Sequence, residues 1–381
     1  MRETNQCHAS RWWLSMWIMG IACGGIGCGR EEVPEWTYHE QVQEWQESDD
    51  EEEQLLFDIT KSALLEHSGT WQNPKMLGDP DFDLDQLKQG QEVYSFYCVQ
   101  CHGVTGDGKG EAADILRPRP RDYRQGKFKF TSTPYGYKPR REDLMNTLME
   151  GVSGTSMPSF ALLPEQDLKA VLDYVIALSR RGELEDALLI EAEEVAFEEG
   201  DTDEETAELR AEYISDLVER IAEGWEKAES ATVYPITSRP QFTEDHVKRG
   251  YKAFLKVGCH KCHGADGRGA TEGEVRKDTW GFVTKAADIT SGMLHGGDDP
   301  LDVYRRIHSG INGTPMPNFS KSLQDNPDTL WDLTAYVLYL ANERRRGTSI
   351  DPIEFPKPGE SVLEATMELS ESVADAESPD E

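Results

Sequence analysis

Two short stretches of the chain combine residue types that can do chemistry at a fixed spacing. "CVQCH" covers residues 98–102 and "CHKCH" covers residues 259–263, so each has two cysteines three positions apart and a histidine directly after the second. Cysteine thiols can form thioether bonds, ligate metal ions or exchange disulfides, and an imidazole nitrogen can ligate a transition metal. The two stretches therefore indicate either two sites of the same kind or one site gathered from both.

The spacing favours covalent attachment of one haem by each stretch. Two thiols on one helical turn can add across the two vinyl groups of a haem, and the histidine that follows then lies under the iron as its proximal ligand. A zinc site would need four ligands drawn from both stretches, and a thioredoxin-like redox pair would need a β-α-β context that the flanking sequence lacks. The predicted attachment cysteines are Cys98, Cys101, Cys259 and Cys262, and the predicted proximal ligands are His102 and His263.

Two methionines recur in matching polar loops. Met157 lies in "SGTSMPSF" and follows the first C-x-x-C-H histidine by 55 residues, and Met316 lies in "NGTPMPNF" and follows the second by 53. A thioether is a soft ligand that suits haem iron, and the proline after each methionine biases its backbone toward an extended conformation. We predict that both methionines are distal ligands. Filling a gap in the core is the ordinary alternative for a methionine, and His295 or His308 would serve in a bis-histidine alternative.

These stretches belong to a longer internal repeat. The C-x-x-C-H stretch, the methionine loop and a final apolar stretch occur twice in the same order, which predicts two copies of one domain at residues 85–182 and 242–347. In each final stretch the apolar residues recur at helical spacing, and the Arg-rich ends "RRG" and "RRRG" indicate a helix C-terminus with glycine just past it. We therefore predict an all-α fold, with two tandem haem domains joined by an acidic helical segment.

Each copy resembles a class I cytochrome c domain, because C-x-x-C-H and G-T-x-M-P-x-F occur together in it. The resemblance implies two covalently attached haem c groups with iron. It also implies contact between the first and last helices of each domain, at Gly90 and Tyr94 against Tyr174 and at Gly250 and Phe254 against Tyr336. A proline carbonyl would steady the proximal histidine, from Pro118 or Pro120 in the first copy, whereas the second copy has Ala286 at the aligned place.

The first 28 residues read as an export signal. A basic start is followed by an apolar run from Trp12 to about Gly27, which ends in small residues and cysteine. This resembles a bacterial lipoprotein signal, with Cys28 as the lipidated residue. Lipidation of Cys23 and a leader that is uncleaved or unlipidated remain open. The segment predicts an exported protein, anchored on the periplasmic side of a bacterial membrane.

The net charge of −33 is concentrated outside the two repeats. The repeats carry +2 and +1, whereas residues 1–84, 183–241 and 348–381 carry −12, −15 and −9. A phosphate backbone would be repelled by these segments, so nucleic acid is excluded as a partner. We predict an acidic helical segment at residues 29–84, an acidic helical hairpin at 183–241 and a largely disordered tail at 348–381.

Cations cluster between haem motif and methionine loop in the first copy only. They are Lys127, Lys129, Lys138, Arg140 and Arg141. We predict that this cluster docks an acidic surface of a redox partner, because rim charges act mainly on the rate of association.

Together these observations predict single-electron transfer between respiratory partners, without an enzymatic activity of its own. With a histidine and a methionine on each iron, neither haem would offer an open position to a substrate. Two alternatives remain open. A dihaem cytochrome c peroxidase-like enzyme would need one exposed iron face, and an electron-transfer subunit of a larger membrane oxidoreductase would share the same chemistry.

Overall fold

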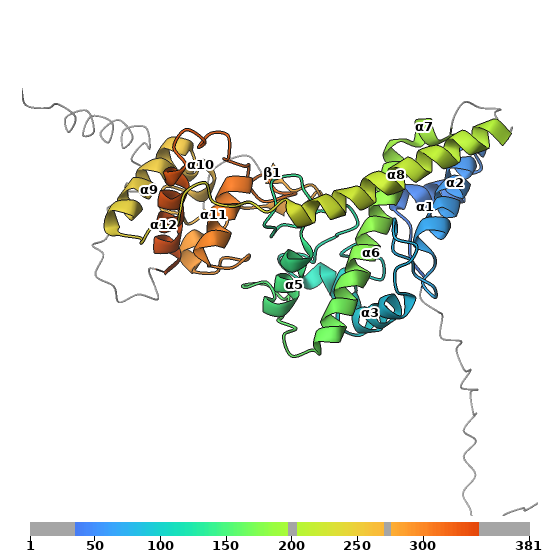
Figure 1. The fold of residues 1–381 in the computed structure, drawn as a ribbon, viewed down its shortest axis with the longest axis horizontal. Helices are drawn as coiled ribbons and strands as arrows, with labels where there is room; N and C mark the ends of the chain where they lie inside the picture. The colour runs from blue at the N-terminus through green and yellow to red at the C-terminus, as the bar shows by residue number, and fades with distance from the viewer. Residues whose placement is uncertain (1–34, 197–203, 270–275, 343–381) are drawn as a thin grey trace, which may run out of the picture. The chain divides into compact units, whose positions relative to one another are not determined.

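A computed structural model describes residues 35–196, 204–269 and 276–342 (Figure 1). The described residues from Glu35 onward belong to one compact unit. The predicted leader at 1–28 and the tail at 348–381 lie outside the described residues. Among the helices that are described, none has both the length and the apolar run that a membrane span requires.

The first haem domain is built around two crossing helices. It contains α3 (Leu84–Tyr97), the one-turn α4 (Val99–His102), η1 (Ala113–Ile115), α5 (Arg141–Glu150) and α6 (Glu165–Ile190). Helix α3 begins after Asp83, whose carboxylate accepts hydrogen bonds from the backbone amides of Asp85 and Gln86. Helices α3 and α6 cross where Gly90 lets the two backbones meet, and the rings of Tyr94 and Tyr174 lie 5.3 Å apart. The predicted contact between first and last helix is therefore confirmed.

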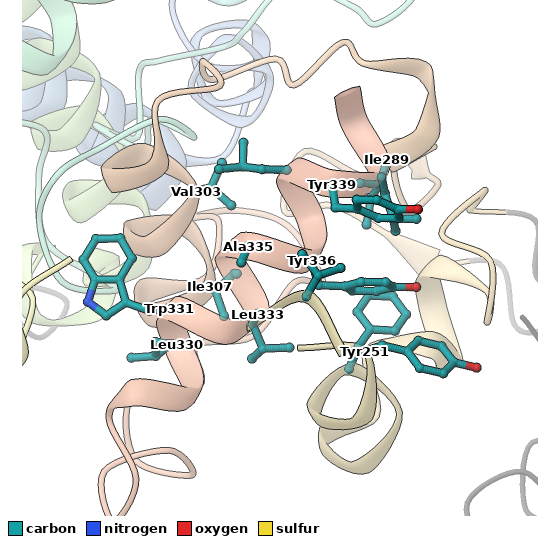
Figure 2. Close-up of a cluster of buried hydrophobic side chains, with 14 of the residues drawn as sticks. Tyr251, Ile289, Val303, Ile307, Leu330, Trp331, Leu333, Ala335, Tyr336 and Tyr339 are labelled. Carbon is teal, nitrogen blue, oxygen red and sulfur yellow. The ribbon is translucent and has the colours of Figure 1, made fainter. Parts of the chain in front are cut away.

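The second haem domain repeats this arrangement. It contains α9 (Glu244–Val257), α10 (His260–His263), the two-residue strands β1 (Arg276–Lys277) and β2 (Val283–Thr284), η2 (Ile289–Ser291), α11 (Pro300–Ser309) and α12 (Asp328–Asn342). The strands pair antiparallel. Gly250 lies against the backbone of Asp332, and the rings of Phe254 and Tyr336 are 5.3 Å apart. Figure 2 shows Tyr336 and Trp331 within the buried cluster that α12 contributes to this core.

The close approach at Gly90 predicts a measurable cost for any side chain there. A Cβ atom on Gly90 would lie 2.0 Å from the carbonyl oxygen of Ala170, which is backbone and cannot rotate away. We expect Gly90→Ala to lower the free energy of unfolding by about 1–3 kcal/mol, as overpacking does. Gly224→Ala in α8 (Glu204–Ser230) is the control, because the nearest atom is 3.9 Å away and alanine favours a helix. Chemical denaturation of both variants checks this, and equal midpoints would contradict it.

Helix α6 runs further than the sequence predicted. It continues through Gly182 and ends at Ile190, so the prediction that "RRG" ends this helix is wrong. Leu184 and Leu188 extend the apolar face and are almost fully buried, in a cluster with residues of α2 and α8. Gly182 serves another purpose, because a Cβ atom there would lie 2.4 Å from the Cβ of Arg124.

The connecting segments are helical. They contain α1 (Glu40–Glu47), α2 (Glu51–Ser68), α7 (Ala192–Ala196) and α8. The predicted apolar stripe of α8 is confirmed at Leu217 and Trp225, which are buried, while Leu209 at its start is 50% exposed. Trp225 packs in the core cluster of the first haem domain, so α8 is part of that domain's hydrophobic core.

Candidate haem sites

Each C-x-x-C-H stretch forms a single helical turn. The amide of His102 donates to the carbonyl of Cys98 at 2.9 Å, and the amide of His263 donates to the carbonyl of Cys259 at 3.0 Å. This turn holds both thiols of a pair on one short helix. All four cysteines are unpaired and half-buried. Burial is the main cause that raises the pKa of Cys98 to about 12 and that of Cys259 to about 11, which indicates apolar surroundings.

The two histidines are oriented in the same way. Nδ1 of His102 lies 3.1 Å from the carbonyl oxygen of Arg121, and Nδ1 of His263 lies 3.1 Å from that of Ala287. A carbonyl oxygen only accepts, so each Nδ1 carries the proton and Nε2 keeps its lone pair for a metal. Burial, as the largest cause, lowers the pKa of both histidines and keeps the imidazoles neutral. Neutral imidazole is the form that ligates iron.

The carbonyl that orients each histidine was not the one expected. The prediction of Pro118 or Pro120 is wrong, because Arg121 provides the oxygen in the first domain. In the second domain the oxygen belongs to Ala287, the residue after Ala286. A backbone carbonyl serves whatever side chain its residue carries, so the residue type at this place holds little information.

The surroundings fit haem better than the alternatives. Nε1 of Trp280 is buried without a hydrogen-bond partner among the described residues, and a haem propionate is an acceptor of the kind it lacks. No group of three or more cysteine, histidine or acidic side chains comes together as a metal site within the described ranges. All four cysteines of the two pairs lie in those ranges, so the zinc site gathered from both stretches is not formed.

The first methionine loop is shaped by its threonine. The hydroxyl of Thr155 donates to the carbonyl of Val152 at 2.8 Å and accepts from the amide of Met157 at 3.1 Å. The amide of Val152 donates to the carbonyl of Met157 at 3.1 Å and closes the loop. Gly154 has φ +75°, a conformation that favours glycine.

The second methionine loop repeats this geometry. The hydroxyl of Thr314 donates to the carbonyl of Ile311 at 2.9 Å and accepts from the amide of Met316 at 3.2 Å. The amide of Ile311 donates to the carbonyl of Met316 at 3.3 Å, and Gly313 has φ +75°. The repeated Gly-Thr thus has a structural reason, which is to set the backbone at each half-buried methionine.

The two domains differ in polarity beside the predicted proximal histidine. In the first domain the hydroxyl of Tyr123 donates to that of Tyr94 at 2.6 Å, and Tyr94 donates to the carbonyl of Gly103 at 2.8 Å. The ring of Tyr123 lies 5.4 Å from that of His102. The second domain has Phe254 and Ile289 at the corresponding places of the repeat, and neither has a hydroxyl. We did not predict this pair from the sequence, although aligning the two copies position by position would have revealed it.

The predicted basic docking cluster is not a single exposed surface. Lys138 pairs with Glu183, and Arg141 pairs with Asp173. Arg140 pairs with Glu142 at 2.9 Å, and burial, as the largest cause, lowers the pKa of Lys129 to about 8. Lys127 and Arg141 are the exposed members of the five. Four of the five cations are thus paired or desolvated within the domain, and docking of an acidic partner through this cluster stays a prediction.

The candidate ligands of the bis-histidine alternative are engaged elsewhere through Nδ1. In His295 this nitrogen lies 2.5 Å from the carbonyl oxygen of Ser153, which belongs to the first haem domain. In His308 it lies 3.2 Å from the hydroxyl of Ser309, and the ring stacks on Tyr304.

Comparison with known proteins agrees with the repeat. The family model for cytochrome c oxidase, cbb3-type, subunit III matches residues 85–175, and the family model for cytochrome c matches residues 247–341. The chain is 23% identical over 256 residues to the cbb3-type cytochrome c oxidase subunit CcoP of Helicobacter pylori, covering 64% of this chain and 60% of that protein. It is also 23% identical over 195 residues to the CcoP subunit of strain 52, covering 50% of this chain and 40% of that protein. The chain thus spans about three fifths or less of these curated relatives.

One solved structure is matched over almost its whole length. A chain of the reducing HAO-like protein complex Kustc0457/Kustc0458 of Kuenenia stuttgartiensis is 31% identical, with a TM-score of 0.50. The match covers 66% of this chain and 96% of that chain. With a cytochrome c-type family model on each repeat and a relative matched over almost its whole length, the chain belongs to the dihaem cytochromes c and carries two covalently attached haem c groups.

Proposed function

We propose that this chain passes single electrons between redox proteins and has no catalytic site of its own. A haem c cycles between its ferrous and ferric states. The observation that carries the proposal is the equivalence of the two methionine loops, in which the same threonine bonds set the backbone of Met157 and of Met316. In both domains the protein therefore offers a neutral histidine and a methionine, the two kinds of side chain that would ligate the iron of a bound haem.

The proposed roles follow for each residue. Two cysteines in each domain would hold the haem through thioether bonds, a histidine would ligate the iron through Nε2, and a methionine would ligate it through its sulfur. The thioether residues are Cys98, Cys101, Cys259 and Cys262, the proximal ligands are His102 and His263, and the distal ligands are Met157 and Met316. The backbone carbonyls of Arg121 and Ala287 keep each proximal ring in its orientation.

A peroxidase-like enzyme is the alternative that the geometry favours less. Such an enzyme needs one iron with an open face, and a domain built for it would not need a second methionine loop with the same internal hydrogen bonds. We therefore propose electron transfer for both domains.

Assembly with other proteins is the second part of the proposal. The matched relatives are a cbb3-type oxidase subunit and a chain of a HAO-like complex. We propose that this chain likewise delivers or accepts electrons as a subunit of, or a close partner to, a larger respiratory oxidoreductase. We further propose export and anchoring by residues 1–28, with lipid on Cys28.

A redox-titrated absorption spectrum of the purified holoprotein tests the function. We expect two haems per chain, each taking up one electron, and a ferric methionine–iron band with the intensity of two haems. Carbon monoxide should not bind the reduced protein. Stoichiometric binding of carbon monoxide would mean an open iron, and the peroxidase-like alternative would then replace this proposal.

The tyrosine pair near His102 predicts a shift in one reduction potential. Removing the hydroxyl of Tyr123 makes the proximal side of the first haem less polar, which disfavours the more highly charged ferric state. A hydrogen bond of about 1 kcal/mol corresponds to roughly 40 mV for one electron. We expect Tyr123→Phe to raise one of the two potentials by a few tens of millivolts and to leave the other unchanged. The control is Tyr234→Phe, at a tyrosine that is 75% exposed; equal titrations of both variants would contradict the prediction.

A further inference from the structure

The methionine loop of the first haem domain is touched by the second domain. Nδ1 of His295 lies 2.5 Å from the carbonyl oxygen of Ser153, four residues before Met157. A Cβ atom on Gly154 would lie 3.2 Å from both Cε1 of His295 and the sulfur of Met293. Since the ring nitrogen can only donate to a carbonyl, His295 holds the loop at its first turn.

The methionine loop of the second domain is held in return by the first domain. The side chain of Asn312 is buried and uses both ends of its amide across the contact. Its oxygen accepts from the amide of Gly136 at 3.0 Å, and its nitrogen donates to the carbonyl of Tyr137 at 3.4 Å. Asn312 stands four residues before Met316, at the same place in its loop as Ser153 in the other.

A third contact links the second loop to the proximal side of the first haem domain. Trp280 packs on the loop, because a Cβ atom on Gly313 would lie 2.2 Å from its ring, and the amide of the preceding Thr279 donates to the carbonyl of Gly313 at 3.0 Å. The guanidinium of Arg121 lies 3.6 Å above the ring of Trp280. Arg121 is also the residue whose carbonyl orients His102. The contact between domains thus reaches from the histidine of one haem site to the methionine loop of the other.

We propose that each haem domain holds the other's methionine loop, with His295 and Asn312 as positioning residues, so that methionine ligation in one domain depends on contact with the other domain. This inference rests on the proposed histidine and methionine ligation. A loop of small polar residues has few apolar contacts of its own to keep it in place. Hydrogen bonds from the neighbouring domain would limit its motion and keep each methionine where it could ligate the iron of a bound haem.

Hydrogen exchange of the full-length holoprotein tests the contact without relying on electron transfer. In Asn312→Ala the amide of Gly136 loses its acceptor, so we expect exchange in residues 134–138 to become about fivefold faster, as the loss of about 1 kcal/mol implies. In His295→Ala we expect faster exchange at residues 152–157. Should the alanine variant fold poorly, Asn312→Ser is the milder variant, because the first loop has a serine, Ser153, at the same place. The control is His246→Ala, a histidine of the same domain bonded to Thr243.

The same variants test ligation. We expect both substitutions at the contact to weaken the ferric methionine–iron band and to let carbon monoxide bind part of the reduced protein, while His246→Ala leaves both readouts unchanged. Unchanged exchange at 134–138 and 152–157 with an intact band would overturn the inference alone. Faster exchange with an unchanged band would also overturn it, because ligation would then not depend on the contact. A wild-type protein that lacks the band would overturn the proposed ligation together with this inference.

Discussion

Replacing both Cys98 and Cys101 with alanine leaves a protein that keeps one covalent haem instead of two. A thioether bond needs a thiol, and this domain has no other pair on one helical turn with a histidine directly after it. The second domain has its own turn at Cys259–His263 and its own buried core, so it should still attach its haem. Denatured protein should therefore show the mass of the chain plus one haem, where the unaltered protein shows the chain plus two.

The reciprocal variant is the control for this experiment. Replacing Cys259 and Cys262 with alanine should remove the other haem and again leave one. Haem staining after denaturing electrophoresis should fall by about half in both variants, because only covalently held haem survives denaturation. Two haems retained in either variant, or bound zinc in the unaltered protein, would show that the attachment residues are assigned wrongly.

Replacing Met316 with alanine opens one iron. The loop backbone is set by Thr314 and Ile311, neither of which depends on the methionine side chain, so we expect the domain to stay folded. The ferric methionine–iron band should fall to half, and carbon monoxide should bind about one haem per chain in the reduced variant. The potential of that haem should fall, because a methionine ligand raises it.

An exposed methionine of the other domain provides the matched control. Met149 lies on α5 and is 38% exposed, so Met149→Ala should leave the band, the carbon monoxide binding and both potentials unchanged. A Met316→Ala protein that keeps the full band would show that Met316 is not a ligand. The function of the second haem would then have to be assigned again.

The difference between the two proximal pockets bears on how electrons move within the chain. Two haems with identical surroundings would have similar potentials, whereas hydrogen bonds and local polarity tune a haem potential. The first domain has the hydroxyls of Tyr94 and Tyr123 beside its histidine, and the second has Phe254 and Ile289. We therefore expect two separable one-electron steps in the titration rather than one step of two equivalent haems.

The attachment residues, the repeat and the all-α fold could be predicted from the sequence because they depend on local spacing. Two thiols and a histidine within five residues are brought together by one helical turn, and this turn is present in both domains. Gly90 and Gly250 were predicted at helix crossings, and both are places where a side chain would meet backbone atoms. In the first case all the reacting groups lie within one short segment. In the second, glycine is the residue type that a close approach of two backbones requires.

The tertiary structure alone decided which distant groups meet. Backbone carbonyls orient both histidines, and every residue has one, so the residue types at Arg121 and Ala287 held no signal. The cations at 127–141 looked like one cluster in sequence, but Lys138 and Arg141 find buried carboxylates on α6 that only the fold brings near. The contacts of Asn312 and His295 join residues more than 140 positions apart. Their partners are backbone groups of another domain, and no pattern in one short segment can reveal such a partner.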